Sequence, residues 1–441
     1  MMPDDSHIAA GVARTVITPP RGIYLIGYGN RYLGNQGVHD DLTATALVLD
    51  DGKERVVIVA CDLLAINEVT AQRVRDGLGS GIEVLIACAH NHAGPIVYAD
   101  QRSSLARQRY VTLLVERIVE AVRQAAADLQ SVHLRWVSSQ AAIAVNRRQR
   151  IPAGEVVIGQ NSQGPVDRSL NLLRLEKDSG EVLATVINFA THGTVLGPGN
   201  HLVSADWIGA MRAKAEAELG GLVVFLQGAT GDMNPRLNTM KENAWQAVSE
   251  LGNEVAGQVV SACQGQMTLL EGTPLHLERR KIWLPLQARV NSPAPPRAYH
   301  KPLSRYLHIP LWLGHWVVDP ILDHLYPWKA EITAREGVWS IPLQVNSLRI
   351  GQVGLVTLGC EVFTEIGMAA KALWPTPYAL FASLTDGCIG YLATSQAHAE
   401  GGYEVELAPY FYRFPAPLAP QAAEMAMSAV KEEVRGIYHP L

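Results

Sequence analysis

Short apolar runs that are rich in β-branched residues alternate along this chain with longer segments of helical periodicity. Each run ends in a turn of small or polar residues, as buried strands do. The runs are RVVIVAC, EVLIAC, VLATVINFA, VVFLQ, GLVTL and ALFASL. The helical patterns cover residues 104–129, 206–219, 243–263 and 420–438. This alternation predicts an α/β protein with a mixed, mostly buried β-sheet flanked by helices.

The chain contains no repeats and no low-complexity tract, so we expect residues 1–441 to form a single domain. One compositional shift occurs at residues 291–330, which are rich in Pro, Trp, Tyr and His. Its tryptophans argue against a flexible linker. We expect an insertion or lid there, and a packed subdomain or an interface within a homo-oligomer is the alternative.

Charge and apolar content narrow the functional classes. The formal net charge is −5 and no block of Lys or Arg occurs, so nucleic-acid binding is not expected. No apolar stretch reaches the roughly 18 to 20 residues of a transmembrane segment. The N-terminus lacks the basic and apolar regions of a secretory signal, so we expect a cytoplasmic protein. The five cysteines form no CxxC motif and are expected to be free thiols.

Side chains capable of chemistry follow the ends of the predicted strands, where α/β sheets carry their ligand-binding loops. These residues are His90, His92, His192, Asp232, Glu361 and Asp386. Histidine and carboxylate are common zinc ligands, and a catalytic zinc also needs one position open to water. Two simpler explanations stay open, since strand-end histidines are often structural and Glu361 also suits a helix N-terminus.

Several ordered segments resemble the neutral, non-lysosomal ceramidase family. The segment CAHNHAGP at residues 88–95 is similar to that family's HxHSGP segment. The others follow in the family's order and are AVNRR, INFATHGTVLGPGNHLVSADWIGAM, LQGATGDMNP, LGCEVFTEIG and LTDGCIGYLAT. The likeness runs from about residue 10 to about residue 410. It implies the family's catalytic domain, without the C-terminal β-domain of the secreted members.

The resemblance implies a site for one zinc ion per chain. The family's ligands are two histidines, a glutamate and a tyrosine, which fall on His90, His192, Glu361 and Tyr391. Tyrosine is not a usual zinc ligand, so only the resemblance singles out Tyr391. By the same matching, His92 would lie beside the metal and carry protons rather than bind it.

Three further residues follow from the same matching. Arg147 would hold a substrate oxygen or an anionic group, although Arg148 beside it fits the pattern equally. Asp232 would orient a ligand or fix its own turn. Asn234 stands where the family's GDxSPN segment has serine. An amide can donate a hydrogen bond to an oxyanion, but it cannot act as an alcohol nucleophile.

Together these features predict a zinc-dependent hydrolase that cleaves the amide bond of a small or lipid-like N-acyl compound. The expected mechanism is attack by a zinc-activated water, with no covalent intermediate. Because Asn234 replaces the family's serine, ceramide itself is not the expected substrate. Two alternatives remain: a zinc-dependent esterase or lactonase acting on a small carbonyl compound, and a metal-binding homologue without catalytic activity.

Overall fold

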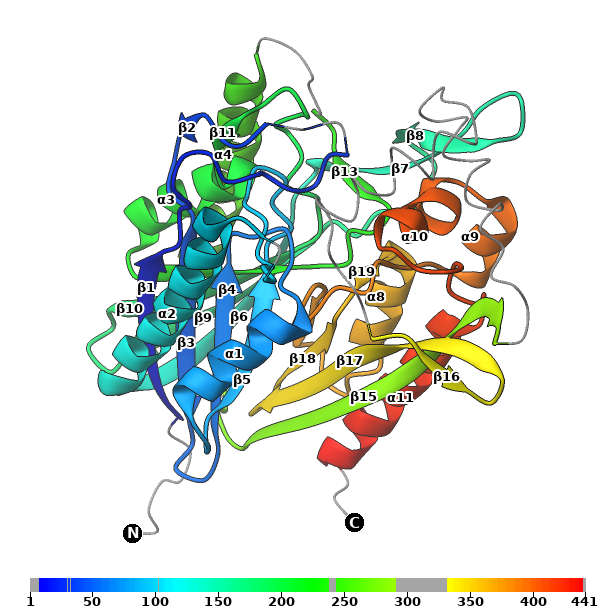
Figure 1. The fold of residues 1–441 in the computed structure, drawn as a ribbon. Helices are drawn as coiled ribbons and strands as arrows, with labels where there is room; N and C mark the ends of the chain where they lie inside the picture. Colours follow the sequence, from blue (N-terminus) through cyan, green and yellow to red (C-terminus); the bar gives the residue numbers. More distant parts are fainter. Residues whose placement is uncertain are drawn as a thin grey trace.

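A computed structural model describes residues 8–29, 31, 33–101, 103–237, 243–290 and 331–438. The insertion or lid predicted at residues 291–330 lies outside these residues. Two β-sheets pack face to face, and helices cover the outer face of each sheet (Figure 1). Among the described helices, none is both long and apolar enough to span a membrane.

The strands of the larger sheet come from the N-terminal part of the chain, between Ile8 and Leu270. Its strands are β1 (Ile8–Val16), β3 (Thr43–Asp50), β4 (Arg55–Cys61), β5 (Glu83–Cys88), β6 (Gln130–Gln140), β9 (Ser169–Lys177), β10 (Val182–Phe189), β12 (Leu222–Gln227) and β14 (Thr268–Leu270). Their order is β12-β10-β9-β6-β1-β3-β4-β5, and β14 pairs with β6. The pairs β4/β5 and β10/β12 are parallel, and the other pairs are antiparallel.

The smaller sheet comes from the C-terminal half. Its strands are β15 (Leu275–Arg289), β16 (Thr333–Arg335), β17 (Val338–Ile350), β18 (Val353–Leu358) and β20 (Ala379–Ala382). Their order is β15-β17-β18-β20, with β16 beside β17 and with β18 parallel to β20. Short ribbons are formed by β2 (Gly37–Val38) with β11 (Leu202–Val203), by β13 (Met233–Pro235), β7 (Ala144–Arg150) and β8 (Val156–Asn161), and by β19 (Glu361–Val362) with β21 (Tyr391–Leu392).

Helices form the two outer layers. The larger sheet is covered by α1 (Glu68–Leu78), α2 (Leu105–Ala127), α3 (Asp206–Leu219) and α4 (Ala244–Gln264), and the smaller one by α8 (Thr364–Ala372) and α11 (Ala422–Tyr438). Shorter helices are α9 (Ser395–Glu400), the π-helix Tyr403–Leu407 and α10 (Ala408–Phe411). The four predicted helices are confirmed as α2, α3, α4 and α11.

The apolar runs in the sequence are continuous because their strands are buried on both faces. In β4, Val57 and Val59 lie in the core beneath α1 and α2. Their neighbours Val56 and Ile58 point the other way, into the core between the two sheets. The predicted α/β class is confirmed, but the predicted strands are divided between two sheets instead of forming one. Periodicity cannot distinguish these cases, because either arrangement buries both faces.

The two sheets are joined where their parallel strands end. The backbone N–H of Asp386, after β20, donates to the carbonyl of Ile86 in β5 at 2.9 Å. The backbone N–H of Ser383 donates to the carbonyl of Gln227, the last residue of β12, also at 2.9 Å. The carboxyl ends of strands from both sheets therefore meet on one side of the molecule.

A buried acid in the outer layer makes stability depend on pH. Glu433 of α11 is 3% exposed, and Ser347 of β17 donates a 2.8 Å hydrogen bond to its carboxyl group. Burial raises the pKa of this group from 4.5 to about 7, even though the Ser347 bond acts in the opposite direction. The folded protein therefore holds this proton more tightly than the unfolded chain, and the fold loses stability as the pH rises from 4.5 to about 7.

We expect Glu433→Gln to remove this loss, because the amide stays neutral. The free energy of unfolding should rise by about 3 kcal/mol at pH 8 and by less than about 1 kcal/mol at pH 5. Urea unfolding of both proteins at the two pH values measures the difference. A gain of equal size at both pH values would show that ionisation of Glu433 is not its cause.

Candidate active site

The predicted zinc ligands gather where the strands of the two sheets end. His90 follows β5 and His192 follows β10, both in the larger sheet. Glu361 comes shortly after β18 of the smaller sheet and is the first residue of β19. Tyr391 lies directly opposite Glu361, because β21 pairs in parallel with β19. Residues far apart in sequence are thereby brought to one end of the sandwich.

Two histidines direct the same type of ring nitrogen toward one carboxylate. Nε2 of His90 lies 3.0 Å from Oε2 of Glu361, and Nε2 of His192 lies 3.4 Å from that same oxygen. On the far side of each ring, Nδ1 of His90 lies 2.9 Å from the carbonyl oxygen of Leu64, and Nδ1 of His192 lies 2.7 Å from the carbonyl oxygen of Met233. A carbonyl partner favours the tautomer with the proton on Nδ1, and in that tautomer Nε2 keeps the lone pair that a metal ligand needs.

His92 belongs to the same cluster. The nearest ring nitrogens of His90, His92 and His192 all lie within 4.8 Å of one another. Neither ring nitrogen of His92 has a hydrogen-bond partner in the described part of the chain. Gly27, at φ +110°, packs so closely on this ring that a Cβ atom would lie 2.5 Å from Nδ1. Glycine is therefore required at position 27 for His92 to reach the cluster.

Burial sets the charges that metal ligands require. Burial lowers the pKa of His192 to about 3. It also lowers the pKa of His92 well below its usual value, and the neighbouring His90 and His192 act in the same direction. Burial acts in the opposite sense on Glu361, but His90 and His192 hold the pKa of its carboxyl group well below the ordinary range. Neutral imidazoles and an ionised carboxylate are the forms that bind a divalent cation, so these donors fit zinc.

Arg147 of β7 reaches the cluster from the other side. Its Nη2 donates a 3.0 Å hydrogen bond to the hydroxyl of Tyr391. Its Nη1 donates to Oδ1 of Asn234 at 3.4 Å and lies 3.3 Å from Nε2 of His192. Arg148 instead turns away and donates to the carbonyl of Gly401. Of the two adjacent arginines, Arg147 is thus the one that contacts His192, Tyr391 and Asn234.

Two acids from the strand ends are held by partners other than the histidines. Asp232 accepts 2.8 Å hydrogen bonds from both the backbone N–H and the hydroxyl of Thr364, the first residue of α8. Asp386 forms ion pairs with Arg75 at 2.7 Å and with Arg279 at 3.2 Å. Of the two roles considered for Asp232, the geometry supports fixing its turn, in this case against the start of α8.

Tyr412 is a site residue that no sequence pattern singles out. Its hydroxyl donates a short hydrogen bond to Oε1 of Glu361, the oxygen that faces away from the histidines. The thiol of Cys388 donates to the same hydroxyl at 3.5 Å. An aromatic-rich stretch surrounds Tyr412 in the sequence, but nothing local indicates that it meets a carboxylate 51 residues away.

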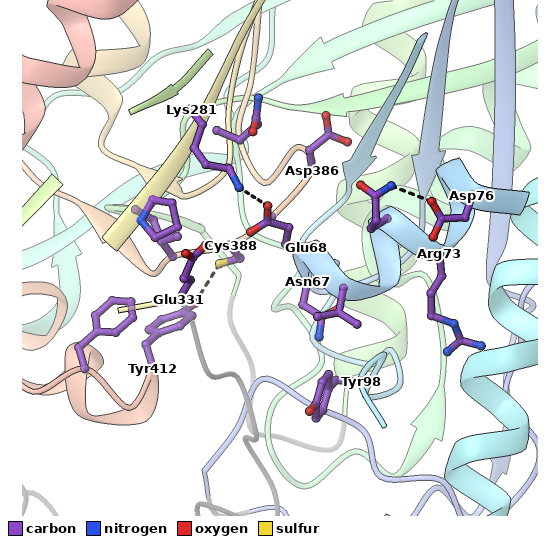
Figure 2. Close-up of a pocket in the computed structure, with 18 residues that line it drawn as sticks. Asn67, Glu68, Arg73, Asp76, Tyr98, Lys281, Glu331, Asp386, Cys388 and Tyr412 are labelled. Carbon is purple, nitrogen blue, oxygen red and sulfur yellow. Dashed lines mark hydrogen bonds and ion pairs between the residues drawn. The ribbon is translucent and has the colours of Figure 1, made fainter. Parts of the chain in front are cut away.

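A cavity of about 570 Å³ adjoins this tyrosine (Figure 2). Tyr412 and Cys388 line it, and buried Pro342 and Phe414 contribute apolar surface. Charged residues from α1 and β15 also line it, including an ion pair between Glu68 and Lys281 (Figure 2). Tyr412 thus contacts both the cavity and Glu361.

Comparison with known families identifies the chain. The profile of the N-terminal part of neutral/alkaline non-lysosomal ceramidases matches residues 9–273, which is more than half of the chain. The chain belongs to this family. The match includes His90, His92 and His192, whereas Glu361 and Tyr391 lie beyond it and are brought to the histidines by the fold.

Curated relatives of this ceramidase-family chain match it over about half of its length. It is 28% identical over 247 residues to a neutral ceramidase of Mycobacterium tuberculosis, a match that covers 48% of this chain and 38% of that protein. It is 25% identical over 262 residues to neutral ceramidase A of Dictyostelium discoideum, covering 53% of this chain and 36% of that protein. The chain therefore matches less than two fifths of the length of either relative.

Two solved structures share the fold over almost the whole chain. A ceramidase complexed with C2 superimposes with a TM-score of 0.74 at 17% identity, covering 99% of this chain and 76% of that one. The neutral ceramidase from Pseudomonas aeruginosa gives a TM-score of 0.73 at 18% identity, with coverages of 99% and 75%. The predicted relationship to a ceramidase-like domain is confirmed at the level of fold.

Removal of the Tyr412 hydroxyl tests the importance of its contact with Glu361. We expect Tyr412→Phe to weaken binding of a divalent metal ion, tested with zinc, by about tenfold or more, because hydrogen bonds to a ligating carboxylate orient it for the metal. Competition with a chromogenic chelator measures the affinity. Tyr98→Phe is the matched control, since Tyr98 lines the same cavity and has no contact with Glu361 among the described interactions. Equal zinc affinity in both variants would contradict the role given to Tyr412.

Proposed function

We propose that this chain is a zinc-dependent hydrolase that cleaves the amide bond of an N-acyl compound. The observation that carries the proposal is the convergence of His90 Nε2, His192 Nε2 and Glu361 Oε2. The names of its curated relatives and structural neighbours, which are ceramidases, support amide cleavage. The substrate class is an N-acyl compound, and ceramide is not assumed.

His90, His192, Glu361 and Tyr391 would hold the zinc ion. When bound, zinc supplies Lewis-acid chemistry: it polarises a carbonyl group and lowers the pKa of water to about 7. Burial keeps the imidazoles of His92 and His192 neutral, as a site for a metal ion requires. Burial also raises the pKa of the Tyr391 phenol, although the guanidinium of Arg147 acts in the opposite direction.

The carbonyl oxygen of the substrate would lie between Arg147 and Asn234. Arg147 presents Nη1 and Nη2 toward the site and is itself buried, so its charge is poorly screened by solvent. Asn234 accepts from Arg147 through Oδ1, which leaves its NH₂ group available to donate. As an amide, Asn234 stabilises negative charge on oxygen but does not act as a nucleophile.

His92 is the proposed proton carrier. It is neutral, and neither of its ring nitrogens has a hydrogen-bond partner among the described residues. It lies beside His90 and His192 at ring-centroid distances of 4.9 and 5.6 Å. An imidazole in this position takes a proton from water and delivers it to the leaving nitrogen.

A pair of alanine substitutions separates the role of His92 from that of a ligand. We expect His90→Ala to abolish zinc binding, and His92→Ala to retain one zinc per chain while lowering turnover about 10²- to 10⁴-fold. Zinc content by mass spectrometry, beside turnover of an N-acyl substrate, measures the contrast. Equal loss of zinc in both variants would make His92 a ligand and contradict this division.

A substrate screen tests the proposed bond. Matched N-acyl amides and O-acyl esters should show preferential cleavage of the amides, which a chelator stops and added zinc restores. Preferential cleavage of esters or lactones would assign the site to the alternative esterase. A zinc-free protein whose activity is indifferent to chelator would overturn the proposal as a whole.

A further inference from the structure

Two adjacent arginines share one buried carboxylate beside the candidate active site. Nε of Arg147 donates to Oε1 of Glu404 at 2.9 Å, and Nη1 of Arg148 donates to Oε2 at 2.7 Å. Neighbouring residues of a regular strand point to opposite faces. In β7 the pairing with β8 shifts register between Asn146 and Arg148, an irregularity of the kind that redirects side chains. This shift accounts for both guanidinium groups reaching the same acid.

The three charged groups are almost completely removed from solvent. The side chains of Arg147, Arg148 and Glu404 are 5%, 8% and 1% exposed. Buried charges require partners, because each has lost its hydration. Arg148 has further acceptors in Glu400, at 3.3 Å, and in a backbone carbonyl. Among the described residues, Glu404 supplies the carboxylate that pairs with Arg147.

The position of Glu404 determines which atoms of Arg147 face the site. Glu404 binds Nε, the nitrogen nearest the side-chain stem, and leaves Nη1 and Nη2 directed toward Tyr391, Asn234 and His192. The rings of Tyr391 and Tyr403 lie 5.4 and 5.8 Å from the guanidinium carbon and limit its sideways movement. The carboxylate therefore sets the direction of the guanidinium group.

The backbone around Glu404 is built for this contact. Glu404 lies in the π-helix Tyr403–Leu407, a rare helix form that is often found at functional sites. The preceding Gly402 has φ +102°, and a Cβ atom there would lie 3.1 Å from Nη1 of Arg148. Glycine at position 402 thus allows Arg148 to approach the start of the π-helix.

We propose that Glu404 is a positioning residue that holds Arg147 in the direction needed to bind a substrate oxygen or a product carboxylate. The anion-binding part rests on the proposed function, whereas the effect of Glu404 on the direction of Arg147 does not. Because Glu404 binds Arg147 only through Nε, it acts on the substrate through that guanidinium and makes no contact of its own with the reacting atoms.

The test uses the zinc-loaded protein and hexanoate, the carboxylate released from either a hexanoyl amide or a hexanoyl ester. We expect Glu404→Gln to weaken hexanoate binding by about tenfold in calorimetry, as Arg147→Ala does, because a misdirected guanidinium loses its paired hydrogen bonds. Glu400→Gln is the matched control, since Glu400 pairs with Arg148 and Arg150. The proposal is overturned if Glu404→Gln binds hexanoate as tightly as the Glu400→Gln control while Arg147→Ala does not.

Crystal structures separate this proposal from the proposed function. In Glu404→Gln, Nη2 of Arg147 should move away from the hydroxyl of Tyr391, and an unmoved guanidinium overturns the proposal whatever the activity. If Arg147→Ala leaves hexanoate binding unchanged, the role of Arg147 in the proposed function fails, and the crystal structure alone decides the role of Glu404.

If Glu404→Gln does not fold, Glu404→Asp takes its place, because it keeps the charge but is too short to span both arginines. Unchanged hexanoate affinity in that variant also overturns the proposal.

Discussion

The candidate active site depends on the face-to-face packing of two sheets whose parallel strands end on the same side. Buried Asn188 of β10 holds the sheets together there, since its side-chain NH₂ donates to the carbonyl of Leu226 at 2.9 Å and to that of Phe381 at 2.7 Å. One amide thus satisfies carbonyls from both sheets, and leaving such groups unpaired in a buried position is costly. The same packing brings His192, which follows β10 of the larger sheet, to within 3.4 Å of Glu361, which follows β18 of the smaller sheet.

The polar side chains around the histidines form a series of linked contacts, in which the position of each side chain depends on its neighbour. Glu361 is held by Tyr412 on one oxygen and faces His90 and His192 with the other. Arg147 is anchored through Nε and presents its remaining nitrogens to the site. In a buried network, removal of one partner leaves its neighbour without compensation. The residues behind the site are therefore as important to its geometry as those that face it.

Much of the fold and part of the site could be predicted from local patterns. Periodicity identified the long helices, because burial on one side leaves a repeating signal in the sequence. The position of polar residues after apolar runs pointed to His90, His192 and Glu361, while only family resemblance pointed to Tyr391. Tyr412 and Glu404 could not be predicted, because they leave no local signal: Tyr412 meets Glu361 from 51 residues away, and Glu404 meets Arg147 from 257 residues away.

The sequence by itself determined the α/β class, the strand ends that carry the site and the residue types able to bind a metal. Tertiary structure alone decided which side chains meet there. It divided the strands between two sheets, turned Arg147 toward the histidines and Arg148 away from them, and placed Asp232 against the start of α8. The reason is physical: side-chain direction follows strand register, and register is set by pairing and packing between distant segments.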